Sequence, residues 1–204
     1  MTDLRVPALA ALVLVGICFL AGVRVAFVRP KRRHRYRASR VSGAILGAEV
    51  IAIAAAPVPP GRAAAALALL AVALGLFLWA AWANRARKLG LAFAEALPEH
   101  VQSGGPYALV RHPFYASYLL AFLGGAVAAG SPWLVPAVFA GALTYWRAAR
   151  DEEERFARSP LAVAYGEYAA RTGMFLPFLP HPRYGSTPGN ATPASSRSPD
   201  GNAG

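Results

Sequence analysis

Residues 105–115 read Gly-Pro-Tyr-Ala-Leu-Val-Arg-His-Pro-Phe-Tyr, and residues 150–154 read Arg-Asp-Glu-Glu-Glu. Between these two polar tracts, the 34 residues from Pro113 to Trp146 carry no formal charge. Near the middle of this run, Gly130-Ser131-Pro132 forms a turn signal, so the chain can enter a bilayer and return. The sequence therefore predicts a membrane hairpin whose two polar ends meet at the same membrane face.

The rest of the chain also has the composition of a membrane protein. It has 204 residues, of which 56% are hydrophobic, so it reads as one polytopic domain over residues 1–180 and not as a soluble globule. We predict an all-α bundle of about five transmembrane helices, at residues 6–28, 41–57, 63–84, 113–130 and 132–149. Residues 181–204 are rich in Ser, Pro, Asn and Gly, and we expect them to form a disordered cytoplasmic tail.

The distribution of positive charge predicts the orientation in the membrane. A net charge of +11 is compatible with nucleic-acid binding, but the basic residues cluster directly after the first apolar run, from Arg24 to Arg40. With this block in the cytoplasm, only Arg5 and Arg62 of the 21 basic residues fall outside. This is the positive-inside pattern, which predicts an outside N-terminus, a cytoplasmic C-terminus and contact with anionic membrane lipids, without nucleic acid. The alanine-rich spans suggest a bacterial inner membrane.

Cysteine and histidine argue against a metal enzyme. Cys18 is the only cysteine and lies in the first predicted span, which excludes an intramolecular disulfide and a thiolate cluster. The four histidines lie in separate segments without the short spacing that chelation on one helix needs.

Several segments near the hairpin carry further expectations. Helix five should continue past the bilayer through Arg150 and the acidic triplet, because little in this stretch resists a helix. We expect a short amphipathic helix at Leu89–Leu97, and another within Pro160–Pro180 that covers the site or lies on the membrane. Glu49 lies in mid-span, where a charge is costly, so it is either a protonated structural residue or a contact to a lipid substrate.

The two polar tracts together resemble the isoprenylcysteine carboxyl methyltransferase and phospholipid methyltransferase superfamily. In that superfamily a G-x-Y-x-x-x-R-H-P-x-Y run and a later E-E pair build the S-adenosylmethionine site. This chain matches the run from Gly105 to Tyr115 with intact spacing, and the resemblance extends over roughly residues 63–180. It implies a cytoplasmic site for S-adenosyl-L-methionine and a lipid-like or lipidated methyl acceptor.

Carried over by position, the resemblance assigns cofactor contacts to two groups of residues. The first group comprises His100, Val101, Tyr107, Arg111, His112, Pro113, Phe114 and Tyr115. The family often reads H-x-x-V before the tyrosine, where this chain has Glu99-His100-Val101-Gln102. The second group is Glu152, Glu153 and Glu154, one of which matches the family's cofactor glutamate; Glu153 fits when Tyr165 serves as the anchor. Arg150 is the candidate for the catalytic arginine that orients the acceptor.

Other interpretations stay open at this point. The acidic triplet alone could be a solvated helix surface that pairs with arginines at helical spacing, such as Arg150 or Arg158. A membrane reductase of related helical architecture would use NADPH at a cytoplasmic site, and a non-catalytic membrane protein would use the basic loop for assembly or lipid contact. The residues do not choose between carboxylate O-methylation and amine N-methylation, and they leave the oligomeric state undetermined.

Overall fold

The computed structural model describes residues 3–26, 34–84 and 100–177. Its helices are α1 (Arg5–Ala26), α2 (His34–Ala55), α3 (Pro60–Asn84), α4 (Pro113–Ala129), α5 (Val135–Ala157) and α6 (Ala162–Ala169), with short 3₁₀ turns η1 (Gly105–Ala108) and η2 (Pro132–Leu134). Within these ranges the extended structure is limited to an isolated parallel bridge between Val110 and Gly173. The predicted all-α bundle is thus confirmed.

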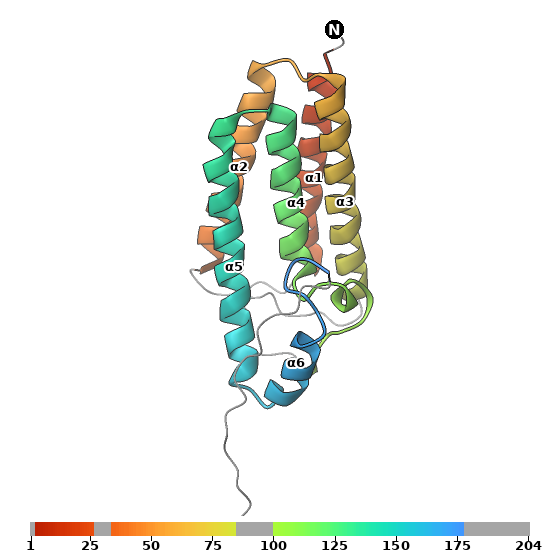
Figure 1. The fold of residues 1–204 in the computed structure, drawn as a ribbon, viewed down its shortest axis with the longest axis vertical. Helices are drawn as coiled ribbons and strands as arrows, with labels where there is room; N and C mark the ends of the chain where they lie inside the picture. Colours follow the sequence, from red (N-terminus) through yellow and green to blue (C-terminus); the bar gives the residue numbers. More distant parts are fainter. Residues whose placement is uncertain (1–2, 27–33, 85–99, 178–204) are drawn as a thin grey trace, which may run out of the picture.

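Helix α4 lies at the centre of the bundle. It packs against α1, α2, α3 and α5, and Figure 1 shows α2 and α5 on one side of it and α1 and α3 on the other. The short helix α6 lies at one end of the bundle, beside the part of α5 that extends beyond its neighbours. The turns and loops with polar residues therefore lie mainly at this end of the molecule.

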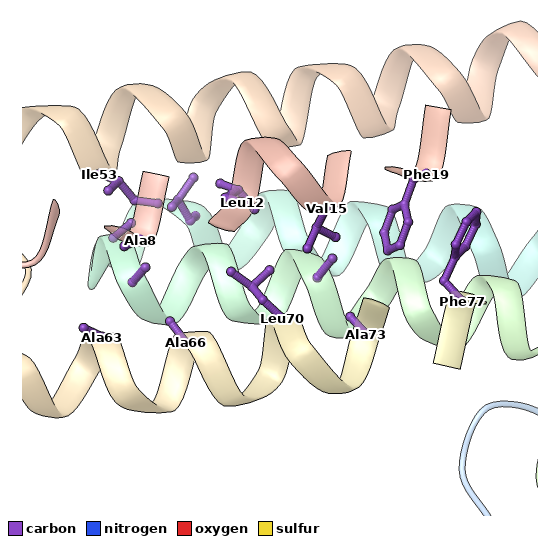
Figure 2. Close-up of a cluster of buried hydrophobic side chains, with 14 of the residues drawn as sticks. Ala8, Leu12, Val15, Phe19, Ile53, Ala63, Ala66, Leu70, Ala73 and Phe77 are labelled. Carbon is purple, nitrogen blue, oxygen red and sulfur yellow. The ribbon is translucent and has the colours of Figure 1, made fainter. Parts of the chain in front are cut away.

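The main core is an apolar stripe on α3 that faces α4 and α1. Its buried positions on α3 are spaced alternately by three and four residues, which keeps them on one face of a helix: Ala63, Ala66, Leu70, Ala73, Phe77, Ala80 and Asn84. Figure 2 shows side chains of α1 and α3 converging on α4, with the rings of Phe19 and Phe77 4.6 Å apart between centroids. All members of the stripe are apolar except Asn84, at the end where α3 stops.

Helices α3 and α4 approach each other closely because α4 carries glycine at the contact. A Cβ atom at Gly124 would lie 3.1 Å from Cγ of Leu70 and 3.3 Å from the backbone oxygen of Ala66. Between membrane helices, such close approach of backbones through small residues provides van der Waals contact that lipid cannot supply.

Three of the helices are long and apolar enough to cross a membrane, over windows of Arg5–Gly22, Ala38–Ala55 and Pro60–Asn84. Helix α4 is apolar throughout but has only 17 residues, or about 25 Å of helix. Helix α5 is apolar only in its first half. The predicted hairpin is therefore present, but its two arms differ from the three long apolar helices.

The turn of the hairpin follows the predicted Gly130-Ser131-Pro132 signal. Gly130 ends α4 with a φ of 60°, a left-handed conformation that glycine adopts without steric cost. The backbone N–H of Gly130 donates to the oxygen of Ala126, and η2 then leads into α5. Helix α5 continues to Ala157, which confirms that it runs through Arg150 and the acidic triplet.

Several predictions differ from the structure or lie outside it. Helix α2 begins at His34 and not near residue 41, because the basic residues before the apolar run are compatible with a helix even though they would not enter the bilayer. The predicted helix at Leu89–Leu97, residues 27–33 of the basic block, and the tail at residues 181–204 lie outside the described residues.

Candidate active site

The site begins with a short pairing between the segment before α4 and the segment after α6. The backbone N–H of Arg111 donates to the oxygen of Gly173 at 2.8 Å, and that of His112 donates to the oxygen of Met174 at 3.1 Å. Pro113 follows as the first residue of α4, a position where its missing N–H costs nothing. The side chains of Arg111 and His112 are thereby held at the start of α4.

The last turns of α5 bring the acidic triplet to the same place. Successive residues of a helix point about 100° apart, so three consecutive glutamates cannot face one site equally. Glu153 is buried, the side chain of Glu152 is 16% exposed, and that of Glu154 is 42% exposed. Glu154 accepts a hydrogen bond from the exposed Arg158 at 3.1 Å. The structure therefore distinguishes three residues between which the sequence left a one-residue ambiguity.

Arg111 is enclosed by protein groups. Its Nε atom donates to Oε1 of Glu153 at 2.8 Å, and its Nη1 atom donates to the backbone oxygens of Ala169 and Thr172. The side chain of Arg111 is fully buried, and its Nη2 atom is buried without a partner in the described part of the chain. Arg111 therefore connects α5 to the end of α6 and to the segment after it, and one of its donors stays unpaired within the described residues.

His112 lies between the two glutamates that face the site. Its Nδ1 atom is 3.2 Å from Oε2 of Glu152, and its Nε2 atom is 3.2 Å from Oε1 of Glu153. Both ring nitrogens face carboxylate oxygens, an arrangement that is fully satisfied only when both nitrogens carry a proton. Burial alone would lower the pKa of His112, but the hydrogen bonds to Glu152 and Glu153 outweigh burial and raise this pKa above its ordinary value.

Glu153 is correspondingly held as a carboxylate. Burial alone would raise its pKa, but hydrogen bonds from His112 and Arg111, together with their positive charges, lower the pKa of Glu153 to about 2. The four groups Arg111, His112, Glu152 and Glu153 thus form a buried or partly buried cluster of alternating charge. We call these four residues the ionic cluster.

Aromatic residues surround the ionic cluster. The Tyr115 hydroxyl donates to Oε1 of Glu152 at 2.9 Å, and its ring stacks on the His112 imidazole at 5.6 Å between centroids and an interplanar angle of 10°. Phe175 meets the same imidazole edge-on at 6.1 Å. Further along α5, towards its apolar half, the ring of Tyr145 lies 5.0 Å from that of Tyr115 between centroids. The Tyr145 hydroxyl shares a 2.7 Å hydrogen bond with the Ser42 hydroxyl of α2.

A second group of polar atoms joins the site from α3 and η1. The Nδ2 atom of Asn84 donates to the Tyr107 hydroxyl at 2.7 Å, and the Tyr168 hydroxyl donates to the backbone oxygen of Tyr107 at 2.7 Å. Tyr107 is thus fixed from both sides, by the end of α3 and by α6. Asn84 was not among the site residues predicted from the sequence. It could have been noticed as a polar residue that continues the three-four spacing of the apolar stripe.

The remaining predicted residues lie around this centre in different environments. The ring of Phe114 faces the main core, 5.4 Å from Phe77. Arg150 lies one turn before the glutamates, with its guanidinium 5.9 Å from the centre of the Trp146 ring. His100 is exposed and Val101 is half-buried, in the segment that leads into η1. Cofactor contacts for these residues, and a catalytic role for Arg150, stay predictions.

Glu49 lies away from the ionic cluster. It is fully buried between α2 and α4, and both of its carboxyl oxygens lack a hydrogen-bond partner in the described part of the chain. A Cβ atom at Gly125 would lie 2.3 Å from Oε2 of Glu49. Ten residues of α4, or about 15 Å along its axis, separate Gly125 from Tyr115.

A comparison with known families identifies the class of protein. The family model described as phospholipid methyltransferase matches residues 62–163, from the start of α3 into α6. The chain belongs to the phospholipid methyltransferase family. This family is part of the superfamily that also contains the isoprenylcysteine carboxyl methyltransferases, as the two polar tracts predicted. No curated protein and no solved structure matches the chain.

Membership in the phospholipid methyltransferase family gives the site a functional setting. The matched residues include all four members of the ionic cluster, as well as Asn84 and Tyr107. Together with the three long apolar helices, the family assignment makes this chain an integral membrane protein of a methyltransferase family.

Proposed function

We propose that this protein transfers a methyl group from S-adenosyl-L-methionine to a lipid-like or lipidated acceptor at the cytoplasmic face of a bacterial inner membrane. The proposal is supported chiefly by the ionic cluster, in which Glu152 and Glu153 of α5 meet His112 and Arg111 at the start of α4. Family membership supports the reaction class, and the position of the cluster at the polar end of an apolar bundle supports an acceptor that enters from the lipid.

The residues present fit this cofactor, which carries an ammonium, a carboxylate, ribose hydroxyls, an adenine ring and a sulfonium cation. The side chain of Glu152 is partly accessible, and its carboxylate can accept from an ammonium or a hydroxyl. The buried Nη2 atom of Arg111 is a donor without a partner among the described residues, as a carboxylate ligand would require. The rings of Tyr115 and Phe175 beside His112 offer faces for adenine or for a cation.

Bound S-adenosyl-L-methionine supplies an electrophilic methyl group on a sulfonium. The chain's own contribution is to place the acceptor atom in line with that group and to exclude water, since displacement reactions depend strongly on geometry. A carboxylate acceptor needs no base. An amine acceptor must lose a proton, and Glu152 is the more accessible of the two clustered carboxylates to receive it. Arg150, one turn earlier on α5, is the proposed residue for orienting the acceptor.

The proposal is tested by incubating membranes that contain the protein with methyl-labelled S-adenosyl-L-methionine and identifying the labelled product by mass spectrometry. The expected result is a labelled lipid or lipidated product that is absent from membranes without the protein. The Glu154→Gln variant is a matched control and should retain labelling, because Glu154 pairs with Arg158 at the surface. Saturable binding of NADPH, with no response to S-adenosylhomocysteine, would instead indicate a reductase.

A further inference from the structure

We propose that Asn84 is a ligand-binding residue of this site, and that its side-chain oxygen accepts a hydrogen bond from an N–H or O–H group of the bound cofactor or acceptor. The inference rests on the proposed function, because it requires that a small molecule occupies the site. It concerns a residue on α3 that lies outside both polar tracts from which the site was predicted.

The position of Asn84 is unusual for a polar side chain. It is the last residue of α3 and is only 1% exposed. It continues the stripe of buried alanine, leucine and phenylalanine residues that packs α3 against its neighbours. An apolar residue at this position would extend the core without the desolvation cost of an amide, so packing alone does not account for asparagine.

Within the described ranges, the protein provides a hydrogen-bond partner for only one of the two polar atoms of the Asn84 amide. Its Nδ2 atom donates to the Tyr107 hydroxyl at 2.7 Å, whereas its Oδ1 atom is buried and has no hydrogen-bond partner in the part of the chain that the structure describes. Buried polar atoms in folded proteins are nearly always paired, because an unpaired one loses its hydrogen bonds to water without replacement. A partner for Oδ1 that comes from outside the chain resolves this.

Tyr107 connects Asn84 to the ionic cluster. Its hydroxyl is the acceptor for Asn84, and its backbone oxygen accepts from Tyr168. The pKa of Tyr107 is raised, first by burial and also by the negative charge of Glu152. The phenol therefore lies within electrostatic reach of Glu152, with Asn84 bound directly to it.

The chemistry of these groups indicates which kind of ligand group binds to Oδ1 of Asn84. A carbonyl oxygen only accepts hydrogen bonds, and the Glu152 carboxylate near Tyr107 also only accepts. A ligand carboxylate would be repelled here, whereas a hydroxyl or an amine would be bound. Two sources offer such groups: the ribose hydroxyls, amine and ammonium of the cofactor, or an amine or hydroxyl of the acceptor.

The test compares three forms of the full chain in detergent, with ligand binding measured by calorimetric titration. Asn84→Leu removes the acceptor at nearly constant size, and Asn84→Asp retains an acceptor oxygen that the Tyr107 hydroxyl can donate to. Each of the three forms is titrated with S-adenosylhomocysteine and with its 2′-deoxy, 3′-deoxy and deaminated analogues. Methyl transfer is also measured at increasing concentrations of a total membrane lipid extract.

If the partner of Oδ1 belongs to the cofactor, Asn84→Leu should raise the Kd for S-adenosylhomocysteine by about 10-fold or more, as expected for a buried acceptor that loses its donor. One analogue should then bind wild type and Asn84→Leu with similar Kd values, because it lacks the donor in question. If the partner belongs to the acceptor, the Kd should be unchanged and the half-saturating lipid concentration should rise by about 10-fold. In both cases Asn84→Asp should stay close to wild type.

Three results would overturn the inference. Wild-type values for Asn84→Leu in both assays would mean that Oδ1 binds only a structural water. Equal losses in Asn84→Leu and Asn84→Asp would mean that Asn84 acts only through its N–H bond to Tyr107. If Asn84→Leu does not fold, the inference is overturned when wild type binds every analogue as tightly as S-adenosylhomocysteine and also transfers methyl groups equally well to lipids with and without an amine or hydroxyl group. Failure of wild type to bind S-adenosylhomocysteine at all would instead contradict the proposed function.

Discussion

The Nε atom of Arg111 lies 2.8 Å from Oε1 of Glu153, although the two residues are 42 positions apart in the chain. Both side chains are buried, and the membrane hairpin of α4 and α5 lies between them in sequence. The pair closes the hairpin at its polar end. Because His112 binds the same oxygen of Glu153, the start of α4 and the end of α5 form one electrostatic unit.

Removing the Arg111 charge should destabilise the protein strongly. Arg111→Met would remove the shorter of the two ion pairs of Glu153. It would also remove the hydrogen-bond donor of the backbone oxygens of Ala169 and Thr172. We expect the free energy of unfolding to fall by about 3–5 kcal/mol, the usual cost of breaking a buried ion pair. Thermal unfolding in detergent measures it. Arg158→Met is the matched control and should change little, since Arg158 pairs with Glu154 at the surface.

The stability of the protein should depend on pH on both sides of neutrality. The pKa of Glu153 falls from 4.5 to about 2 on folding, so its contribution is present above pH 4.5 and is lost as the pH falls towards 2. The pKa of His112 is raised above 6.5, so its contribution is complete below pH 6.5 and is lost as the pH rises through the raised value.

Thermal unfolding from about pH 2 to about pH 9 checks this dependence on both sides. The melting temperature of the wild type should decline on the alkaline side, and His112→Asn should flatten that decline, because the residue that loses its proton is gone. An unchanged alkaline slope in His112→Asn would show that another group is responsible.

Glu49 and Gly125 should be energetically coupled. Gly125→Ala would place a Cβ atom 2.3 Å from Oε2 of Glu49, and overpacking of this kind costs about 1–3 kcal/mol. Glu49→Ala removes the carboxyl that causes the clash, so the double variant should lose less stability than the sum of the two single variants. Unfolding of all four proteins gives the coupling, and strict additivity would contradict the contact.

Methyl-transfer assays on the variant Glu49→Gln address the two interpretations of Glu49. A structural role predicts that Glu49→Gln, which keeps the shape of the side chain, leaves transfer unchanged. A contact to the lipid substrate predicts that the half-saturating acceptor concentration rises while binding of S-adenosylhomocysteine is unaffected. The distance of Glu49 from the ionic cluster makes the second result separable from any effect on the cofactor.

The sequence was sufficient to predict the helical bundle and the meeting of the two polar tracts. The uncharged run with a glycine-proline turn predicted the α4–α5 hairpin, and the lack of helix breakers predicted the extension of α5 to the acidic triplet. These features follow from hydropathy and turn chemistry, which act locally along the chain.

Side-chain direction could not be predicted in the same way. Which of Glu152, Glu153 and Glu154 faces the site depends on the rotation of α5 about its axis, and packing against α4 and α6 sets this rotation. The same holds for Phe114, which matches the motif but faces Phe77. Asn84 was missed because its role depends on η1, which returns to the end of α3 only in three dimensions.

The central claim is that the ionic cluster binds the methyl donor, and titration of S-adenosylhomocysteine into single glutamate variants tests it most directly. Wild type and Glu154→Gln should bind with the same Kd, whereas Glu152→Gln should bind at least about 10-fold more weakly, since Glu152 offers the accessible carboxylate of the cluster. Equal affinities for Glu152→Gln and Glu154→Gln, in proteins with wild-type melting temperatures, would contradict the account.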